Sequence, residues 1–376
     1  MIPDLLTARN GRIFDGTDLR DGVAARFEHG RLAALAPEAD LPDEGVALDL
    51  GGDILSPGYI DLQVNGGGGV MFNDAPEPAT LRRIAEAHRG LGVAGILPTL
   101  ITDTPEITRA AIAAAVRAVD EGVPGIAGLH LEGPHLSVAR KGAHDPALIR
   151  PMTGDDLAAL CDAAGRLPAL LVTVAPESVT PAQVATLAGA GVVVSLGHSD
   201  AAYETCMAHA AAGARAVTHL FNAMSQLGNR APGLVGAALA SGALSAGLIA
   251  DGIHVHPATL RAAWDAKTGP GGIFLVSDAM APAGTDLAAF TLNGRPITRA
   301  DGRLTLADGT LAGADLDLTT AIRTCVGQAG LPLAEALRAA TTRPATLIGR
   351  DHPLRLDTAI RIAPGIDAVR PAIAAA

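Results

Sequence analysis

Eight short apolar runs occur between residues 59 and 278, and Ala-rich segments of helical length separate most of them. Each run is apolar almost throughout, which is typical of strands whose two faces are both buried in a parallel sheet. Eight strands that alternate with helices favour a closed (β/α)8 barrel over an open doubly wound sheet. We therefore predict an α/β fold, a TIM-like barrel, with strands at 59–65, 95–102, 126–132, 170–175, 192–198, 216–222, 245–251 and 273–278.

The segments on either side of the barrel follow a different pattern. Residues 1–53 read as short strands separated by Gly-containing turns, which predicts part of a small β-sandwich domain. The barrel domain is predicted over 54–349. It includes a β-hairpin insertion near 285–312, where Asn-Gly and Asp-Gly turns recur, and later helices at 316–329 and 333–348. Residues 350–376 form an irregular C-terminal tail.

The charge balance limits the partners that the chain can bind. Its formal net charge is −11, and Lys141 and Lys267 are its only lysines. Nucleic acids and anionic membranes attract clustered Lys and Arg, so we expect neither as a partner. If the substrate is itself an anion, a few local cations must overcome the overall negative field.

Cysteine usage and hydropathy bear on the compartment. Cys161, Cys206 and Cys325 are widely spaced and form no CxxC pair, which is typical of reduced thiols in a cytoplasmic protein. No basic segment followed by an apolar one begins the chain, so no signal peptide is expected. The weakly apolar stretch 235–250 is too short for a membrane span, which needs about 20 strongly apolar residues.

Polar side chains stand at the carboxyl ends of six of the predicted strands, the end at which barrel enzymes place their chemistry. A single histidine there is more often structural than a ligand, but buried charged groups in such number require pairing or a metal. One Glu and two His from separate strands can make a three-ligand site with an open position for water. The strand-end residues are Gln63, Asn65, His130, Glu132, His198, His219, Asn222, Asp251, His254, His256 and Asp278.

Asp278 suits the role of a carboxylate beside such a metal, acting first as general base and then as general acid. A fourth metal ligand or a salt-bridge partner is the alternative interpretation of the same residue.

Several strings make the interpretation specific. They are PGYID at 57–61, LHLEGP at 129–134, GHS at 197–199, THLFNAM at 218–224 and SDAMAPAG at 277–284. In combination they resemble the N-acetylglucosamine-6-phosphate deacetylase family of the amidohydrolase superfamily, and the resemblance extends from the N-terminal β unit to about Gly349.

The resemblance implies a role for each matching residue. Glu132, His198 and His219 bind the catalytic metal. Asp278 deprotonates the attacking water and then protonates the leaving amine, and His144 polarises the acetyl carbonyl. The residues implied to contact the amino-sugar phosphate are Gln63, Ala143, Asn222, Ala223 through its backbone N–H, Arg230 and His254.

Two departures from the wider pattern matter. Many amidohydrolases carry His-x-His at the end of the first strand and bind a second metal there, whereas this chain has Gln63-Val64-Asn65. Neutral amides are poor ligands for a transition metal, so we expect one divalent ion per active site, zinc first, with iron, cobalt or manganese as alternatives. The tail after residue 349 lacks a clear strand motif, so the sandwich is either incomplete or closed by a divergent tail.

The expected reaction is hydrolysis of the acetamide of N-acetylglucosamine 6-phosphate by a cytoplasmic homodimer, since members of the family are usually dimers. The galactosamine epimer is an alternative substrate, and another amide hydrolysed by the superfamily is a more distant one. A catalytically inert structural homologue is a remote alternative, because such proteins lack part of the Glu/His/His/Asp set that this chain retains.

Overall fold

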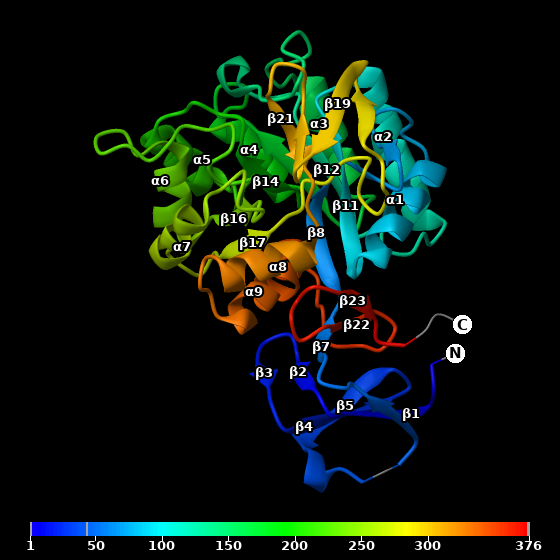
Figure 1. Cartoon of the computed structure of the whole chain (residues 1–376). Helices are drawn as coiled ribbons and strands as arrows, with labels where there is room; N and C mark the ends of the chain where they lie inside the picture. The colour runs from blue at the N-terminus through cyan, green and yellow to red at the C-terminus, as the bar shows by residue number, and fades with distance from the viewer. Residues whose placement is uncertain (1, 43, 374–376) are drawn as a thin grey trace.

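The predicted barrel is the largest part of the computed structural model, which describes residues 2–42 and 44–373 (Figure 1). Its parallel sheet has the order β17-β16-β15-β14-β13-β12-β11-β8, so strands adjacent in sequence are adjacent in space. Each of the predicted apolar runs overlaps one of these strands, although β11 begins two residues before its predicted run, and the match confirms the fold class. The bounds are β8 Tyr59–Val64, β11 Val93–Ile101, β12 Leu129–Glu132, β13 Leu170–Val174, β14 Val193–Leu196, β15 Ala216–Val217, β16 Ser245–Leu248 and β17 Ile273–Leu275.

Polar contacts join the first and last strands of this sheet. The backbone N–H of Asp278 donates to the carbonyl of Gln63 at 3.1 Å. The N–H of Ser277 donates to the Asp61 carboxylate at 3.2 Å. The Asp61 carboxyl is wholly buried, and this burial raises its pKa to about 7. These contacts between the first and last barrel strands therefore set the position of Asp278 relative to strand β8.

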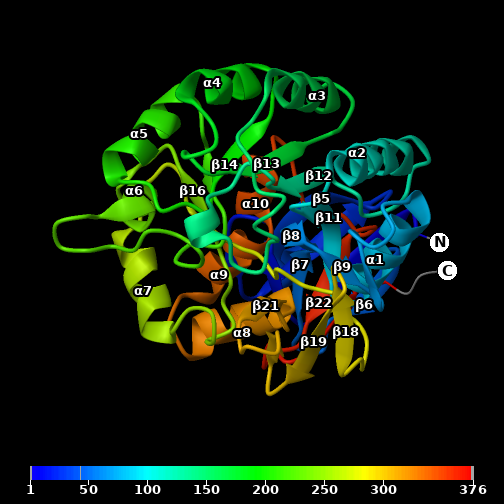
Figure 2. The same cartoon turned by 90° about the horizontal axis from the view of Figure 1, so that it is seen from above.

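Helices surround the barrel strands, as the view from above shows (Figure 2). Thr104, Thr153 and Thr180 cap three of them, because each hydroxyl accepts a backbone N–H that the first helical turn leaves unpaired. The helices are α1 Pro78–Gly90, α2 Pro105–Asp120, α3 Gly154–Ala164, α4 Pro181–Gly189, α5 Tyr203–Ala212, α6 Gly233–Ala240, α7 Pro257–Ala266, α8 Leu318–Gly327, α9 Leu333–Ala340 and α10 Thr342–Leu347, with the short 3-10 turns η1 Glu38–Asp40 and η2 Val138–Arg140.

The prediction of one helix over 333–348 is wrong, because the chain breaks at Thr341, whose φ is −127° and ψ −84°. Pro344 explains the break. A proline has no N–H to donate, and its ring would clash with the carbonyl four residues earlier in a continuous helix.

A β-sandwich packs below the barrel and uses both ends of the chain (Figure 1). One sheet has the order β5-β4-β1-β6 and the other β23-β22-β7-β2-β3. The C-terminal tail therefore returns to the N-terminal unit, where β22 pairs with β7. The strands are β1 Leu5–Arg9, β2 Arg12–Phe14, β3 Leu19–Arg20, β4 Val23–Glu28, β5 Arg31–Pro37, β6 Val46–Asp49, β7 Ile54–Pro57, β22 Ala359–Ile362 and β23 Val369–Pro371.

The hairpin insertion forms a four-stranded antiparallel sheet at the end of the barrel opposite the sandwich (Figure 1). Its strands are β18 Ala289–Leu292, β19 Arg295–Ala300, β20 Arg303–Thr305 and β21 Leu311–Ala314. The N–H of Ala314 donates to the carbonyl of Asp278 at 2.9 Å, which docks the insertion on the end of the last barrel strand. A smaller hairpin, β9 Gly66–Gly67 with β10 Val70–Met71, follows the first barrel strand.

The barrel core is filled mainly by aliphatic side chains and alanines, as expected for a chain with only 2% aromatic residues. All three cysteines are free thiols. Burial raises the pKa of Cys206 and of Cys325 to about 12, which makes both poor nucleophiles. Within the described residues, no helix combines the length and the apolar character needed to cross a membrane.

Candidate active site

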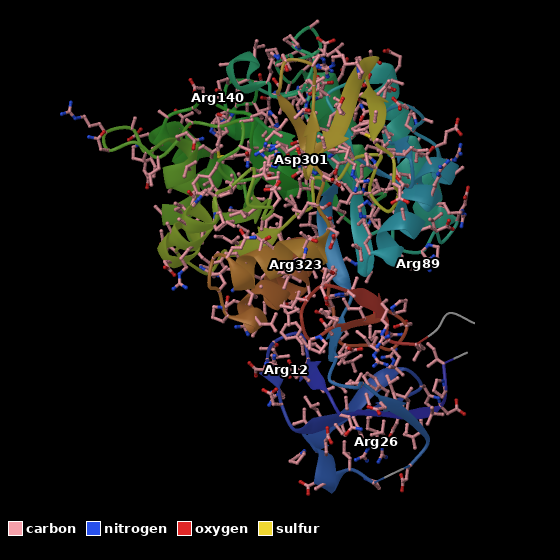
Figure 3. The ribbon with its side chains drawn as sticks, in the orientation of Figure 1. Arg12, Arg26, Arg89, Arg140, Asp301 and Arg323 are labelled. Atoms are coloured by element: carbon pink, nitrogen blue, oxygen red, sulfur yellow. The ribbon has the colours of Figure 1, made fainter. Side chains whose placement is uncertain are left out.

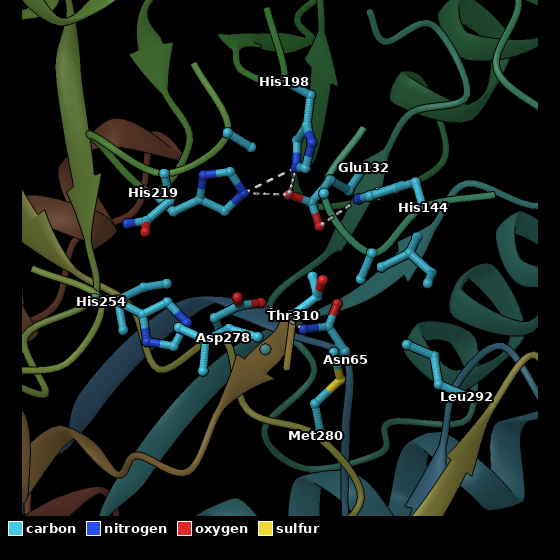
Figure 4. Close-up of a pocket in the computed structure, with 18 residues that line it drawn as sticks. Asn65, Glu132, His144, His198, His219, His254, Asp278, Met280, Leu292 and Thr310 are labelled. Atoms are coloured by element: carbon cyan, nitrogen blue, oxygen red, sulfur yellow. Dashed lines mark hydrogen bonds and ion pairs between the residues drawn. The ribbon is translucent and has the colours of Figure 1, made fainter. Parts of the chain in front are cut away.

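Glu132, His198 and His219 meet at the carboxyl ends of three different barrel strands, and all three are buried (Figure 4). The Nε2 atom of His219 lies 3.0 Å from Glu132 Oε1 and 3.0 Å from His198 Nε2. His198 Nε2 lies 3.3 Å from the same carboxylate oxygen. The predicted metal ligands therefore converge on one point, although the sequence spaces them 66 and 21 residues apart.

The arrangement of these donors fits a divalent metal. His198 Nδ1 lies 2.9 Å from the carbonyl of Arg140, an acceptor only, so Nδ1 carries the proton and Nε2 presents its lone pair. Arg140 lies at the end of the barrel away from the sandwich (Figure 3). A tetrahedral zinc with bonds of about 2.0–2.1 Å separates its ligand atoms by roughly 3.3 Å, close to the separations found here.

The charges at this cluster are strongly perturbed. Burial alone would raise the pKa of Glu132, but its close contacts with the His198 and His219 rings outweigh it and hold that pKa well below its usual range. Burial likewise acts to lower the pKa of His219, yet its hydrogen bond to Glu132 raises it overall. A buried carboxylate is therefore kept ionised where a cation would bind.

Asp278 follows strand β17 and faces the same point. Burial, followed by the nearby charge of Glu132, raises the pKa of Asp278 to about 6. The amide of Asn65 donates to Asp278 Oδ1 at 2.7 Å, and the amide of Gln63 donates to the same oxygen at 3.2 Å. Gln63 also donates to Glu132 Oε1 at 3.1 Å. A carboxyl group with a pKa near neutrality is suited to taking up and returning a proton.

His144 approaches from the loop after β12, and its tautomer follows from its contacts. The backbone N–H of Thr102 donates to His144 Nδ1 at 3.2 Å, so this nitrogen has no proton in the neutral ring. Burial, and then the charge of His198, lower the pKa of His144 to about 3, so the ring is neutral. Its proton is therefore on Nε2, which lies 3.9 Å from Glu132 Oε2 and can donate a hydrogen bond into the site.

His254 lies across the cavity from His144 (Figure 4) and is held by Asp251. Its Nδ1 lies 2.6 Å from Asp251 Oδ2, and the same carboxylate accepts the N–H groups of Ile253 and His254. Because the carboxylate accepts, Nδ1 carries a proton and the ring has one orientation. His254 thus presents Nε2 to the cavity from a rigid loop.

These groups line one cavity of about 250 Å³. Of the predicted site residues, it collects the metal triad, Asp278, His144, Ala143, Asn222, Ala223 and His254. The complete lining is Asn65, Ile101, Glu132, Gly142, Ala143, His144, His198, His219, Asn222, Ala223, Ile249, His254, Asp278, Met280, Leu292, Thr310, Leu311 and Gly313.

Backbone strain marks the strand ends that carry the chemistry. His198, His219 and Asp278 have positive φ values of 47°, 29° and 51°, and Ala223 has 50°. Such conformations cost about 1–3 kcal/mol each in a residue other than glycine. The chain turns sharply at the end of each of these strands, and the packed barrel holds each turn in place.

Two predicted site residues lie elsewhere. Gln63 does not line the cavity, and its amide donates to both Glu132 and Asp278. Arg230 is exposed in the 225–232 loop, which projects from the side of the barrel before α6 (Figures 1 and 2), and it does not line the cavity of its own chain. Among the described residues, Arg230 is not part of the cavity in which most of the other predicted site residues meet.

Other lining residues were not among the predicted contacts. Asn65 stands two positions after Gln63 at a strand end, so the strand-end signal includes it. Asp251 does not line the cavity, but it carries the same signal and contacts His254. Leu292, Thr310 and Leu311 come from the hairpin insertion, whose sequence contains only turn signals and nothing that indicates contact with a barrel mouth.

Comparisons with known proteins agree with this geometry. Residues 54–354 match the model of the Amidohydrolase family. The chain is 46% identical to N-acetylgalactosamine-6-phosphate deacetylase of Shewanella sp. (strain ANA-3), over 79% of this chain and 74% of the relative. It is 37% identical to N-acetylglucosamine-6-phosphate deacetylase of Haemophilus influenzae, over 86% of this chain and 84% of the relative.

Solved structures show the same fold over nearly the whole chain. N-acetylglucosamine-6-phosphate deacetylase from Pasteurella multocida superposes with a TM-score of 0.89 at 33% identity, covering 96% of each chain. A mutant of the Mycobacterium smegmatis enzyme, solved in complex with N-acetyl-D-glucosamine-6-phosphate, has a TM-score of 0.88 at 31% identity and covers 98% of each chain. This chain therefore belongs to the amidohydrolase family of metal-dependent hydrolases, in the group that contains the N-acetylglucosamine-6-phosphate deacetylases.

Proposed function

We propose that this protein hydrolyses the acetamide of N-acetyl-D-glucosamine 6-phosphate, releasing D-glucosamine 6-phosphate and acetate in the cytoplasm. The observation that carries the proposal is the convergence of Glu132, His198 and His219 with Asp278 and His144 in one cavity. An inert homologue would have no need of this set. The resemblance to deacetylases over most of the chain supports the choice of substrate.

Glu132, His198 and His219 would hold one divalent ion. When bound, such an ion supplies the Lewis acidity that makes water a nucleophile near neutral pH. One carboxylate and two imidazoles suit zinc first, and iron, cobalt or manganese are alternatives. A second metal site at the end of β8 is disfavoured, because the amides of Gln63 and Asn65 are engaged as donors to carboxylates.

Asp278 and His144 would divide the proton chemistry. Asp278 takes a proton from the attacking water as the new C–O bond forms at the acetyl carbon. It returns that proton to the sugar nitrogen as the C–N bond breaks, so the amine leaves neutral. His144 donates its Nε2–H to the carbonyl oxygen as negative charge develops there, which is possible because Thr102 N–H occupies Nδ1 and leaves the proton on Nε2.

The sugar phosphate would lie on the side of the cavity formed by Asn222, Ala223 and His254. The backbone N–H of Ala223 and the rings and amides nearby can bind hydroxyl and phosphate oxygens. Ala143 faces the same cavity. We assign Gln63 the task of orienting Glu132 and Asp278, because its amide contacts both carboxylates.

We further propose a homodimer in which Arg230 of one protomer binds the phosphate of the substrate in the partner's cavity. Arg230 lies away from the cavity of its own chain, and the same loop exposes Leu227 to 59%. A guanidinium is suited to phosphate, and a projecting loop with an exposed leucine is suited to a subunit contact.

Mixing two inactive variants tests the homodimer. Arg230→Ala and Asp278→Asn proteins, dissociated and reassembled together, would recover about a quarter of the wild-type sites if Arg230 acts across the interface. Each variant reassembled alone is the control. No recovery in a mixture shown to contain heterodimers would overturn the arrangement, and a monomer by light scattering would do so directly.

N-acetylgalactosamine 6-phosphate is a second candidate substrate, because the 46% identity to the Shewanella relative exceeds the 37% identity to the Haemophilus one. The two substrates differ only in the configuration at C4. A single experiment separates them.

That experiment measures acetate release from both epimers and from unphosphorylated N-acetylglucosamine, with and without a chelator. Chelator-sensitive release, fastest with the glucosamine phosphate, supports the proposal. A faster rate on the galactosamine phosphate would transfer the assignment to that epimer. No release from any of the three, by folded and metal-loaded protein, would exclude this function.

A further inference from the structure

The cavity has a polar flank and an apolar flank, which lie on opposite sides of the reacting groups (Figure 4). His254 lies on one flank, and its ring can bind hydroxyl or phosphate oxygens. Met280 and Leu292 lie on the other flank. Ile101 lines the cavity as well, and it belongs with Met280 and Leu292 to one hydrophobic cluster that is separate from the barrel core.

This apolar flank is built from several distant segments. Ile101 ends strand β11, Met280 follows Asp278 by two residues, and Leu292 ends the first strand of the hairpin insertion. Ala143, next to His144, packs against the same cluster. The apolar side chains therefore adjoin the two residues proposed to handle the proton and the carbonyl oxygen.

The three side chains of the apolar flank are buried. Ile101 is 4% exposed, Met280 3% and Leu292 0%, although all three line the cavity. Side chains this buried leave little free space beside them, so a small alkyl group fits there better than a longer chain. The turn after Leu292 is also tied down, since Arg295 donates to the carbonyl of Ala143 at 2.6 Å.

An N-acyl amino sugar has one polar and one apolar substituent on its amide. With the amide carbonyl placed at the metal triad and His144, the sugar phosphate extends toward His254. The acyl carbon chain must then point toward the opposite flank. We propose that Ile101, Met280 and Leu292 form an acyl pocket that limits the substrate to acyl groups of about acetyl size, with Leu292 as the residue that sets the limit. This inference rests on the proposed deacetylase function.

The test compares kcat/KM for the N-acetyl, N-propionyl and N-butyryl forms of glucosamine 6-phosphate, by release of the free amine. The wild-type protein should lose at least about tenfold for each added methylene, since a closed pocket rejects extra carbon. Leu292→Ala should raise the ratio of kcat/KM for the propionyl form to kcat/KM for the acetyl form by about tenfold or more. Leu292→Val should recover less.

Ile297→Ala is the matched control, because Ile297 is equally buried in the same cluster and does not line the cavity. It should keep the wild-type ratio. Both rates are measured on the same preparation of each variant. An unfolded fraction lowers both rates equally, so the ratio does not change.

Two results would count against the proposal in different ways. Deacetylation by the wild type with the same acyl ratio in Leu292→Ala would overturn the acyl pocket alone. Absence of amine release from all three compounds by wild-type protein would overturn the deacetylase function, and the pocket with it.

Discussion

The guanidinium of Arg295 donates a hydrogen bond to the carbonyl oxygen of Ala143 at 2.6 Å, although 152 residues separate them. This contact joins the tip of the hairpin insertion to the loop that carries His144. The Thr102 N–H holds the ring itself, at 3.2 Å from Nδ1. One contact from the insertion and one from the barrel therefore fix the position of this loop.

Arg295→Ala should therefore lower kcat by roughly tenfold while KM changes little, because a loosened loop misplaces a carbonyl-polarising group. Arg295→Lys should restore part of the loss, since an ammonium can still donate to Ala143. Arg303→Ala, at an exposed arginine of the same insertion, is the control. Wild-type kcat in Arg295→Ala would show that the contact does not position His144.

Asp278→Asn should keep its fold and its metal but lose about 10²–10⁴-fold in kcat, because an amide cannot carry the proton to the leaving amine. Asn65 and Gln63 now donate to Asp278 Oδ1, and the amide oxygen of the variant can still accept from them. Metal content and thermal melting are measured beside steady-state rates. Near-normal turnover would rule out the proton-transfer role.

Gly313→Ala should disturb both stability and rate. A Cβ there would lie 2.6 Å from Met280 side-chain atoms and 2.8 Å from the carbonyl oxygen of Asp278, and φ is +68°. We expect a loss of about 1–3 kcal/mol in unfolding free energy, with a lower kcat because Asp278 is displaced.

Gly309→Ala is the matched control for that change. Gly309 has φ +86° in the same insertion, but nothing lies within 4 Å of its Cβ position. It should show backbone strain with little effect on kcat. Equal rate losses in the two variants would show that the Gly313 contact is unimportant for catalysis. Urea unfolding and acetate release provide the two measurements.

The ion pair of Arg150 and Asp156 should make stability depend on pH. Hydrogen bonds from Arg150 hold the pKa of Asp156 well below its usual range, and Thr153 adds further donors at the start of α3. A depressed folded-state pKa stabilises the fold above the unfolded pKa of about 3.9, and this stability disappears as pH falls through the folded value.

Asp156→Asn should therefore be less stable than wild type at pH 7, and the difference should shrink steadily below about pH 4. Urea unfolding across that range measures it. Asp155→Asn, at the adjacent exposed carboxylate of the same helical turn, controls for the helix dipole. A difference that stays constant between pH 7 and pH 3 would contradict the ion-pair explanation.

The alternation of apolar runs with helical segments determined the barrel, because a strand buried on both faces must be apolar along its whole length. The carboxyl ends of parallel strands meet at one rim, so Glu132, His198, His219 and Asp278 could be placed together before any coordinates. The same logic covers Asn65.

Tertiary structure alone decided the rest. The insertion strand that ends in Leu292 shows only turn chemistry in sequence, and its docking depends on contacts with residues far along the chain, such as Ala143 and Asp278. Protonation states required partners that lie far apart in sequence, as Thr102 does from His144. Local sequence encodes which residues can form a strand or a turn, whereas the folded chain determines which distant side chains a strand end will face.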